Sequence, residues 1–112
     1  MELAPVGPAG FADVRILIER VATAMLERPA LTAMLDLRGT DFVPTMVQAE
    51  LLLDMLAYRS QMIRNRVAIV ANPGTQFGML RLVTIKASLR DVPVVAFTRE
   101  GEARRWLETG IE

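Results

Sequence analysis

Two residue types that carry much of enzyme chemistry are missing from this chain of 112 residues, which contains neither cysteine nor histidine. Without cysteine there are no disulfides, thiolate nucleophiles or cysteine-ligated zinc sites. Without histidine the chain lacks the commonest base near neutral pH and the commonest metal ligand. We therefore predict that the protein is not an enzyme, and we predict no metal site and no cofactor.

The chain also lacks an excess of charge and any long apolar run. Its 13 Lys and Arg residues balance 13 Asp and Glu residues, and no basic stripe is interleaved with aromatics. Nucleic acid is therefore not expected as a partner. No segment approaches the roughly 20 continuous apolar residues of a membrane span. Met1–Gly10 has no charged start followed by an apolar run, so the expected location is the cytoplasm.

The composition that is present predicts a globular protein of one domain. Apolar residues make up 52% of the chain and charged residues 23%, which is close to ordinary globular usage. Residues 1–10 include two prolines and two glycines, which favours an extended arm or a short edge strand. We predict that residues 11–112 form a single α/β domain.

The apolar residues alternate between helical spacing and short unbroken runs. These patterns predict helices over residues 11–28, 44–63, 75–89 and 100–107, and buried strands at 33–37, 67–71 and 92–97. Strands that alternate with helices predict a small, mainly parallel sheet joined by right-handed crossovers. A fourth strand would have to come from residues 2–6. Otherwise one edge of the sheet is left for a partner.

Two of the predicted helices carry notable apolar patterns. In helix 44–63, Thr45 and Gln48 have the spacing of a capping box. One face of that helix carries Val47, Leu51, Met55, Tyr58 and Met62. Helix 75–89 is apolar around much of its circumference, which predicts a second covering surface such as another subunit.

Polar residues follow each predicted strand, at the edge where ligands of open parallel sheets bind. The candidate residues for an anion or ligand site at this edge are Arg38, Thr40, Asp41, Asn72, Thr75, Gln76 and Arg99. Free N–H groups at the helix starts near Thr45 and Thr75 would hold an anion together with Arg38 or Arg99. The alternative is that both threonines are ordinary helix caps.

Asp36 is the one charge inside an otherwise apolar predicted strand. A carboxylate in such a place needs hydrogen-bond partners or a shifted pKa. The simplest interpretation is that it accepts hydrogen bonds from the backbone or from Arg38. A special functional role is the alternative.

Several local sequences occur in the order found in a known family. They are the segment Ala33–Phe42, the segment Arg66–Val70 followed by Phe77-Gly78-Met79, and Val94–Phe97 followed by Glu102-Ala103 and Trp106-Leu107. In these segments the chain resembles the SpoIIAA-like branch of the STAS superfamily, small bacterial domains related in shape to Sec14-type lipid-binding domains. The resemblance implies a β-α superhelix, a mainly parallel sheet with helices packed against it.

Antagonists of anti-sigma factors in this superfamily carry an Asp-Ser-Ser-Gly motif whose serine is phosphorylated as a switch. In this chain the motif falls on Pro44-Thr45-Met46-Val47, so that only Thr45 offers a hydroxyl at the switch position. The resemblance therefore does not carry the switch function to this chain.

Two hypotheses of function follow. The first is a non-enzymatic regulatory or protein-interaction module that works as a homodimer or with another protein. The second is a binding domain for a small apolar or amphipathic, lipid-like ligand. It is motivated by the related lipid-binding shape, the polar rim and the seven methionines.

Overall fold

The computed structural model describes all 112 residues, in which strands and helices alternate from end to end. The elements are β1 (Glu2–Leu3), α1 (Phe11–Glu27), β2 (Ala33–Asp36), α2 (Met46–Tyr58), β3 (Val67–Val70), α3 (Thr75–Ser88), β4 (Val94–Phe97) and α4 (Glu100–Thr109). All strand pairs are parallel, and the sheet order is β1-β2-β3-β4. The predicted α/β class, with a parallel sheet and four helices, is confirmed, and Glu2–Leu3 supplies the fourth strand.

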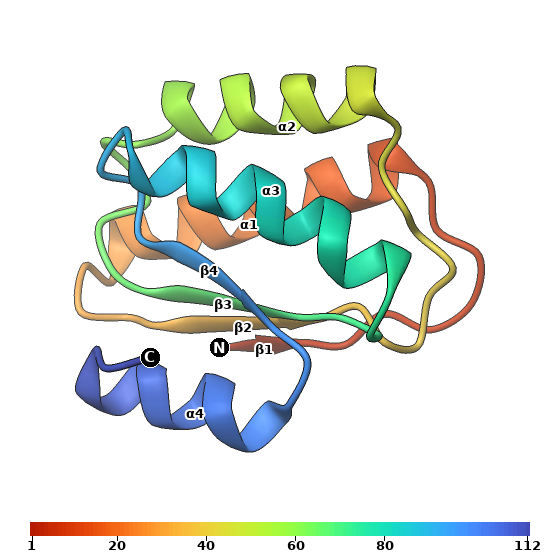
Figure 1. Ribbon diagram of the computed structural model, residues 1–112. Coiled ribbons are helices and arrows are strands. Elements are labelled where there is room, and N and C mark those ends of the chain that lie inside the picture. The colour runs from red at the N-terminus through yellow and green to blue at the C-terminus, as the bar shows by residue number, and fades with distance from the viewer.

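The sequential strand order explains how the helices are layered. Each of the first three helices connects a strand to the next parallel strand on the same side, and right-handed crossovers in one direction place all of them on one face. Figure 1 shows α1, α2 and α3 above the sheet and α4 alone below it. Because α4 follows the last strand and returns to no other, the crossover rule does not apply to it.

The sheet therefore separates two hydrophobic cores of unequal size. The core under α1, α2 and α3 contains 23 buried residues. The core under α4 contains six, in which the rings of Phe97 and Trp106 lie 5.7 Å apart between centroids. No helix is both long and apolar enough to cross a membrane.

The second helix ends earlier than its sequence pattern predicts. It stops at Tyr58, and the chain turns so that the N–H groups of Met62 and Ile63 both donate to the Arg59 carbonyl. This turn directs the Arg59 guanidinium to Glu19 on α1, at 2.7 Å, and places Ile63 in the larger core. Tertiary contacts thus end a helix whose apolar pattern continues.

The same helix has two apolar faces. The face that packs into the core consists of Ala49, Leu52, Leu53 and Leu56. In contrast, Val47, Leu51 and Tyr58 share the opposite face as their spacing predicts, and their side chains are 71%, 49% and 79% exposed. The outer face of α2 is therefore an apolar stripe that nothing in this chain covers.

Candidate functional site

Four of the candidate rim residues meet at the carboxyl edge of the sheet. The buried Gln76 amide donates to the carbonyls of Leu37 and Phe42, at 3.3 and 2.9 Å. Its oxygen accepts from the Asn72 N–H at 2.7 Å. These bonds join the loop after β2 to the start of α3.

The neighbouring polar groups also form hydrogen bonds within the chain. The Asn72 side chain donates to the Arg38 carbonyl at 3.0 Å. The Thr40 hydroxyl donates to the Leu37 carbonyl and accepts from the Phe42 N–H. Every buried side-chain nitrogen and oxygen has a partner within the chain. The side chains at the centre of the rim therefore hold the two loops together by hydrogen bonds, with no buried side-chain polar group left for a ligand.

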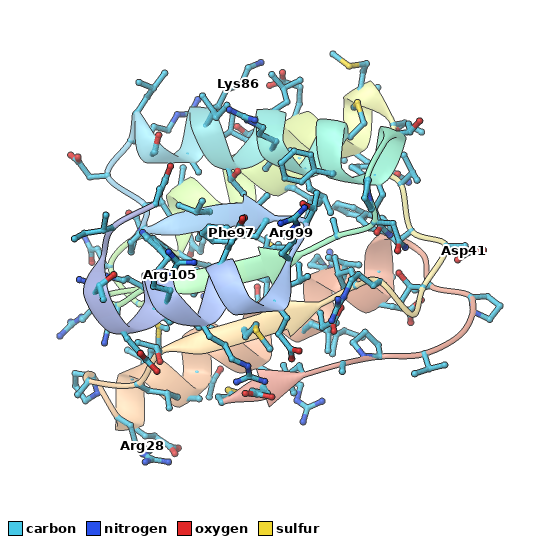
Figure 2. The ribbon with its side chains drawn as sticks, turned by 60° about the horizontal axis from the view of Figure 1, so that its bottom comes forward. Arg28, Asp41, Lys86, Phe97, Arg99 and Arg105 are labelled. Carbon is cyan, nitrogen blue, oxygen red and sulfur yellow. The ribbon has the colours of Figure 1, made fainter.

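Asp41, Thr75 and Arg99 do not join this cluster. Asp41 accepts from the Ala9 N–H at 3.0 Å and so fastens the N-terminal arm. Figure 2 shows Asp41 at one side of the molecule, well away from Arg99 at the start of α4. The candidate rim residues thus share one edge of the sheet without converging on one point.

The helix starts also differ from each other. Thr45 caps α2 as predicted, with its hydroxyl accepting from the Gln48 N–H and the Gln48 side chain accepting from the Thr45 N–H, both at 3.1 Å. Thr75 does not cap α3, so the alternative interpretation of both threonines as helix caps is correct for Thr45 and wrong for Thr75. Gly74 is the N-cap residue of α3, at a φ of 100° that glycine adopts without strain, and no side chain caps this helix.

Asp36 has the partner that its position in the strand requires. The Arg38 guanidinium donates to both carboxylate oxygens, at 3.0 and 2.8 Å, and the Arg38 N–H donates to the same group at 3.1 Å. The Arg38 side chain holds the pKa of Asp36 below its ordinary value, against a smaller opposing effect of burial. Arg38 is therefore engaged within the chain, and it leaves Arg99 as the unpaired cation among the candidate residues.

A larger hollow lies on the other side of the molecule, between α1 and α2. It is a surface groove of about 790 Å³. Its apolar lining includes Phe11, Ile16, Ala24, Leu51 and Met55. Ile16 and Leu51 are about half exposed and lie where the groove meets the outer stripe of α2. Sequence analysis did not identify this groove, although the repeated spacing of Val47, Leu51 and Tyr58 was a signal for the stripe.

The charges along the groove are unevenly paired. Glu19 is neutralised by Arg59, whereas Arg15 in the second turn of α1, Arg20 at its middle and Glu27 at its end form no ion pair. The groove therefore has an apolar floor, two free cations at the beginning and the middle of α1, and a free carboxylate where that helix ends.

The interior offers much less space than the surface. The enclosed apolar cavity beneath α1 and α2 holds about 10 Å³ and is lined by residues such as Leu35 and Leu56. This volume is about that needed for a single water molecule. A small apolar ligand would therefore have to bind in the open groove rather than inside the fold. No three His, Cys, Asp or Glu side chains lie together in a way that holds a metal ion.

The sequence matches no protein-family model, and neither a curated protein nor a solved structure matches it.

Proposed function

We propose that this chain is a STAS-like, non-enzymatic protein-interaction module whose α1–α2 surface binds an amphipathic helix of another protein. The observation that carries the proposal is the second apolar face of α2, with Val47, Leu51 and Tyr58 exposed next to a groove of about 790 Å³. Contiguous exposed apolar surface with a polar rim is typical of docking sites. A groove between two helices suits a helix that presents apolar side chains at i, i+4 and i+7.

The unpaired charges along the groove indicate which kind of helix would bind there. Arg15 near the beginning of α1 and Arg20 at its middle lack partners, and Glu27 lacks one where α1 ends. A bound helix with carboxylates opposite the two arginines would complement them, and such rim charges contribute mainly to orientation and association rate. The expected occupant is therefore an amphipathic helix flanked by acidic residues.

The STAS-like part of the proposal rests on the order of the elements and on the matching local sequences. The sequential parallel sheet agrees with the β-α superhelix that the resemblance implies. Regulatory action through Thr45 is not part of the proposal, because its hydroxyl already caps α2.

The test is titration of two fluorescently labelled helical peptides with the same leucine face, one flanked by glutamates and one by lysines. Fluorescence anisotropy should show tighter binding of the acidic peptide. Leu51→Glu should weaken that binding about tenfold or more, because it places a carboxylate in the apolar contact.

Ile85→Glu is the matched control. Ile85 is 48% exposed, against 49% for Leu51, but it lies on α3 away from the groove. Equal binding of the acidic and basic peptides would contradict the proposal. So would an equal loss of affinity in Ile85→Glu and Leu51→Glu.

The alternative function, binding of a small apolar or amphipathic ligand, is favoured by one observation. The volume of the α1–α2 groove lies within the range of ordinary small-molecule sites, about 300 to 1,000 Å³. Native mass spectrometry of the purified protein distinguishes the two functions. A retained small molecule that is lost in Leu51→Glu would favour the ligand, whereas a bare chain that binds the acidic peptide favours the interaction module.

A further inference from the structure

The outer edge of β4 has unpaired backbone groups. The Val67 and Ala71 N–H groups of the neighbouring strand region donate to the carbonyls of Pro93 and Phe97, both at 2.9 Å. The backbone groups of positions 93, 95 and 97 therefore face β3, and those of Val94, Ala96 and Thr98 face away from the sheet.

Two of the outward-facing N–H groups are unpaired. The Val94 N–H donates to the Val92 carbonyl at 2.9 Å. The N–H groups of Ala96 and Thr98 have no partner within the chain.

This edge is also accessible to another strand. A groove of about 290 Å³ follows it, with Phe77, Arg81 and Ile85 of α3 above and Glu102 of α4 below. Figure 1 shows β4 in front, with α3 above it, α4 below it and no element across its outer side. The opposite edge is only the two-residue strand β1. β4 has neither a charge nor a proline inside its four residues, so no side chain within the strand blocks pairing with another strand.

We propose that a second copy of the chain pairs its β4 antiparallel to this edge, across a two-fold axis at Ala96, to form a continuous eight-stranded sheet. In this register the Ala96 N–H of each copy donates to the partner's Ala96 carbonyl. The Thr98 N–H of each copy donates to the partner's Val94 carbonyl. On the α4 side of the sheet, the half-buried Val95 lies opposite the partner's Phe97, an apolar cross-strand pair.

The charges at the two ends of β4 favour a second copy of the chain as the partner and an antiparallel direction of pairing. Arg99 follows the carboxyl end of β4, and it forms no ion pair in the chain. Glu112 lies near the amino end, because Arg66, just before β3, donates to the Leu107 carbonyl at 3.1 Å and holds the end of α4 there. Glu112 lines the edge groove and is also unpaired. Antiparallel pairing brings each Arg99 beside the partner's Glu112, whereas parallel pairing would place Arg99 beside Arg99.

The first test is the mass of the full chain over a range of concentrations, measured by analytical ultracentrifugation. The wild type should form a dimer. Thr98→Pro should be monomeric at the concentrations where the wild type is dimeric, because proline removes an N–H that the chain's own sheet does not use. Wild-type protein that stays monomeric at the highest concentration would overturn the proposal, and so would a Thr98→Pro variant that is as dimeric as the wild type.

Exchanging the charges of Arg99 and Glu112 tests the register. Both side chains are exposed, so the exchange should not disturb the fold. Arg99→Glu and Glu112→Arg should each raise the dimer dissociation constant about tenfold, because each turns two attractive pairs into repulsive ones. The double variant Arg99→Glu/Glu112→Arg should restore the wild-type value. A double variant as weak as the single ones would overturn the register.

Two controls separate this interface from the α1–α2 surface. Arg28→Glu makes the same charge change at the end of α1, far from Arg99 in Figure 2, and should leave the dissociation constant unchanged. Leu51→Glu should weaken peptide binding and leave the dimer intact. A dimer that is lost in Leu51→Glu and kept in Thr98→Pro would place the interface on α2 and overturn pairing at β4.

Discussion

The guanidinium of Arg66 lies against the Cα of Gly110, in the space that a side chain at position 110 would occupy. A Cβ built there would stand 2.8 Å from Cζ of Arg66 and closer still to one of its terminal nitrogens. From this position Arg66 donates to the carbonyls of Leu107 and Trp106, at 3.1 and 3.4 Å. Gly110 ends α4 with a left-handed φ of 76°, so one glycine permits both the helix end and the arginine that holds it.

Gly110→Ala should therefore destabilise the fold. A left-handed conformation at a non-glycine residue costs about 1 to 3 kcal/mol, and the new methyl group would displace Arg66 from the carbonyls. Urea unfolding measures the effect. Gly101→Ala is the control within the same helix, because open space surrounds that position and its φ is not positive. It should be neutral or stabilising, and equal losses in both variants would contradict the role of Arg66.

Gln76 should be the most sensitive polar residue of the fold. Gln76→Ala leaves the Asn72 N–H and the Phe42 carbonyl without their buried partner, at a cost of about 2 to 4 kcal/mol. Thermal unfolding should show the loss. Thr84→Val is a suitable control. Thr84 is also buried, but its hydroxyl donates only to the Arg81 carbonyl of its own helix, at 3.1 Å. A comparable loss in the control would show that burial alone, rather than the hydrogen bonds between the two loops, makes position 76 sensitive.

Thr45→Ala should cost about 1 kcal/mol, because it removes the hydroxyl that accepts from the Gln48 N–H. Thr45→Asp should retain most of the stability, since aspartate is also a good N-cap residue. Chemical denaturation of both variants tests this. Thr75→Ala should have a small effect, because Gly74 rather than Thr75 occupies the cap position of α3. If Thr45→Ala is as stable as Thr75→Ala, the capping box contributes nothing.

Stability should depend on pH through Asp36. Because the pKa of Asp36 is lowered by Arg38 in the folded state, its contribution is fully present above the ordinary pKa of 3.8 and is lost as the pH falls through the lower folded value. At neutral pH Asp36→Asn should cost about 1 kcal/mol or less, since Arg38 is partly exposed. The difference between wild type and variant should shrink toward zero on acidification.

The control for the pH dependence is a double-mutant cycle. In an Arg38→Gln background, Asp36→Asn should change the acid limb of the stability curve much less, because the guanidinium, the largest cause of the lowered pKa, is gone and only the backbone N–H of residue 38 still donates to the carboxylate. Urea denaturation at several pH values measures all four proteins. An acid limb that is the same with and without Arg38 would assign the effect to another group.

The strands could be predicted well from the sequence, because unbroken apolar runs such as Val67–Val70 need burial on both faces. The start of α2 was also predictable, because Thr45 and Gln48 have the spacing of a capping box. Which face of α2 points outward could not be predicted from the sequence. Leu51 and Leu52 belong to two apolar faces with equally good helical spacing, and packing against α1 and α3 decides which one is buried.

The polar rim shows a second limit of prediction from the sequence. The candidate residues lie along the carboxyl edge because they follow the strands in sequence, but the partners of Gln76 lie 34 and 39 positions away, at the carbonyls of Phe42 and Leu37. Those carbonyls belong to a loop whose path depends on the whole sheet. The sequence therefore indicated where polar residues gather, and the fold determined that they bind each other.

The strand order has a consequence for how the chain folds. Every strand pairs with the strand just before or after it in the sequence, with one helix between them. During synthesis each new strand can therefore dock on an edge that already exists, and no pairing has to wait for the distant end of the chain. Each closure spans 27 to 34 residues, which is far less than a pairing between the two ends of the chain would span, and a lower contact order favours faster folding. Only at the last helix does the chain close on its beginning, when Arg104 of α4 pairs with Glu2 of β1.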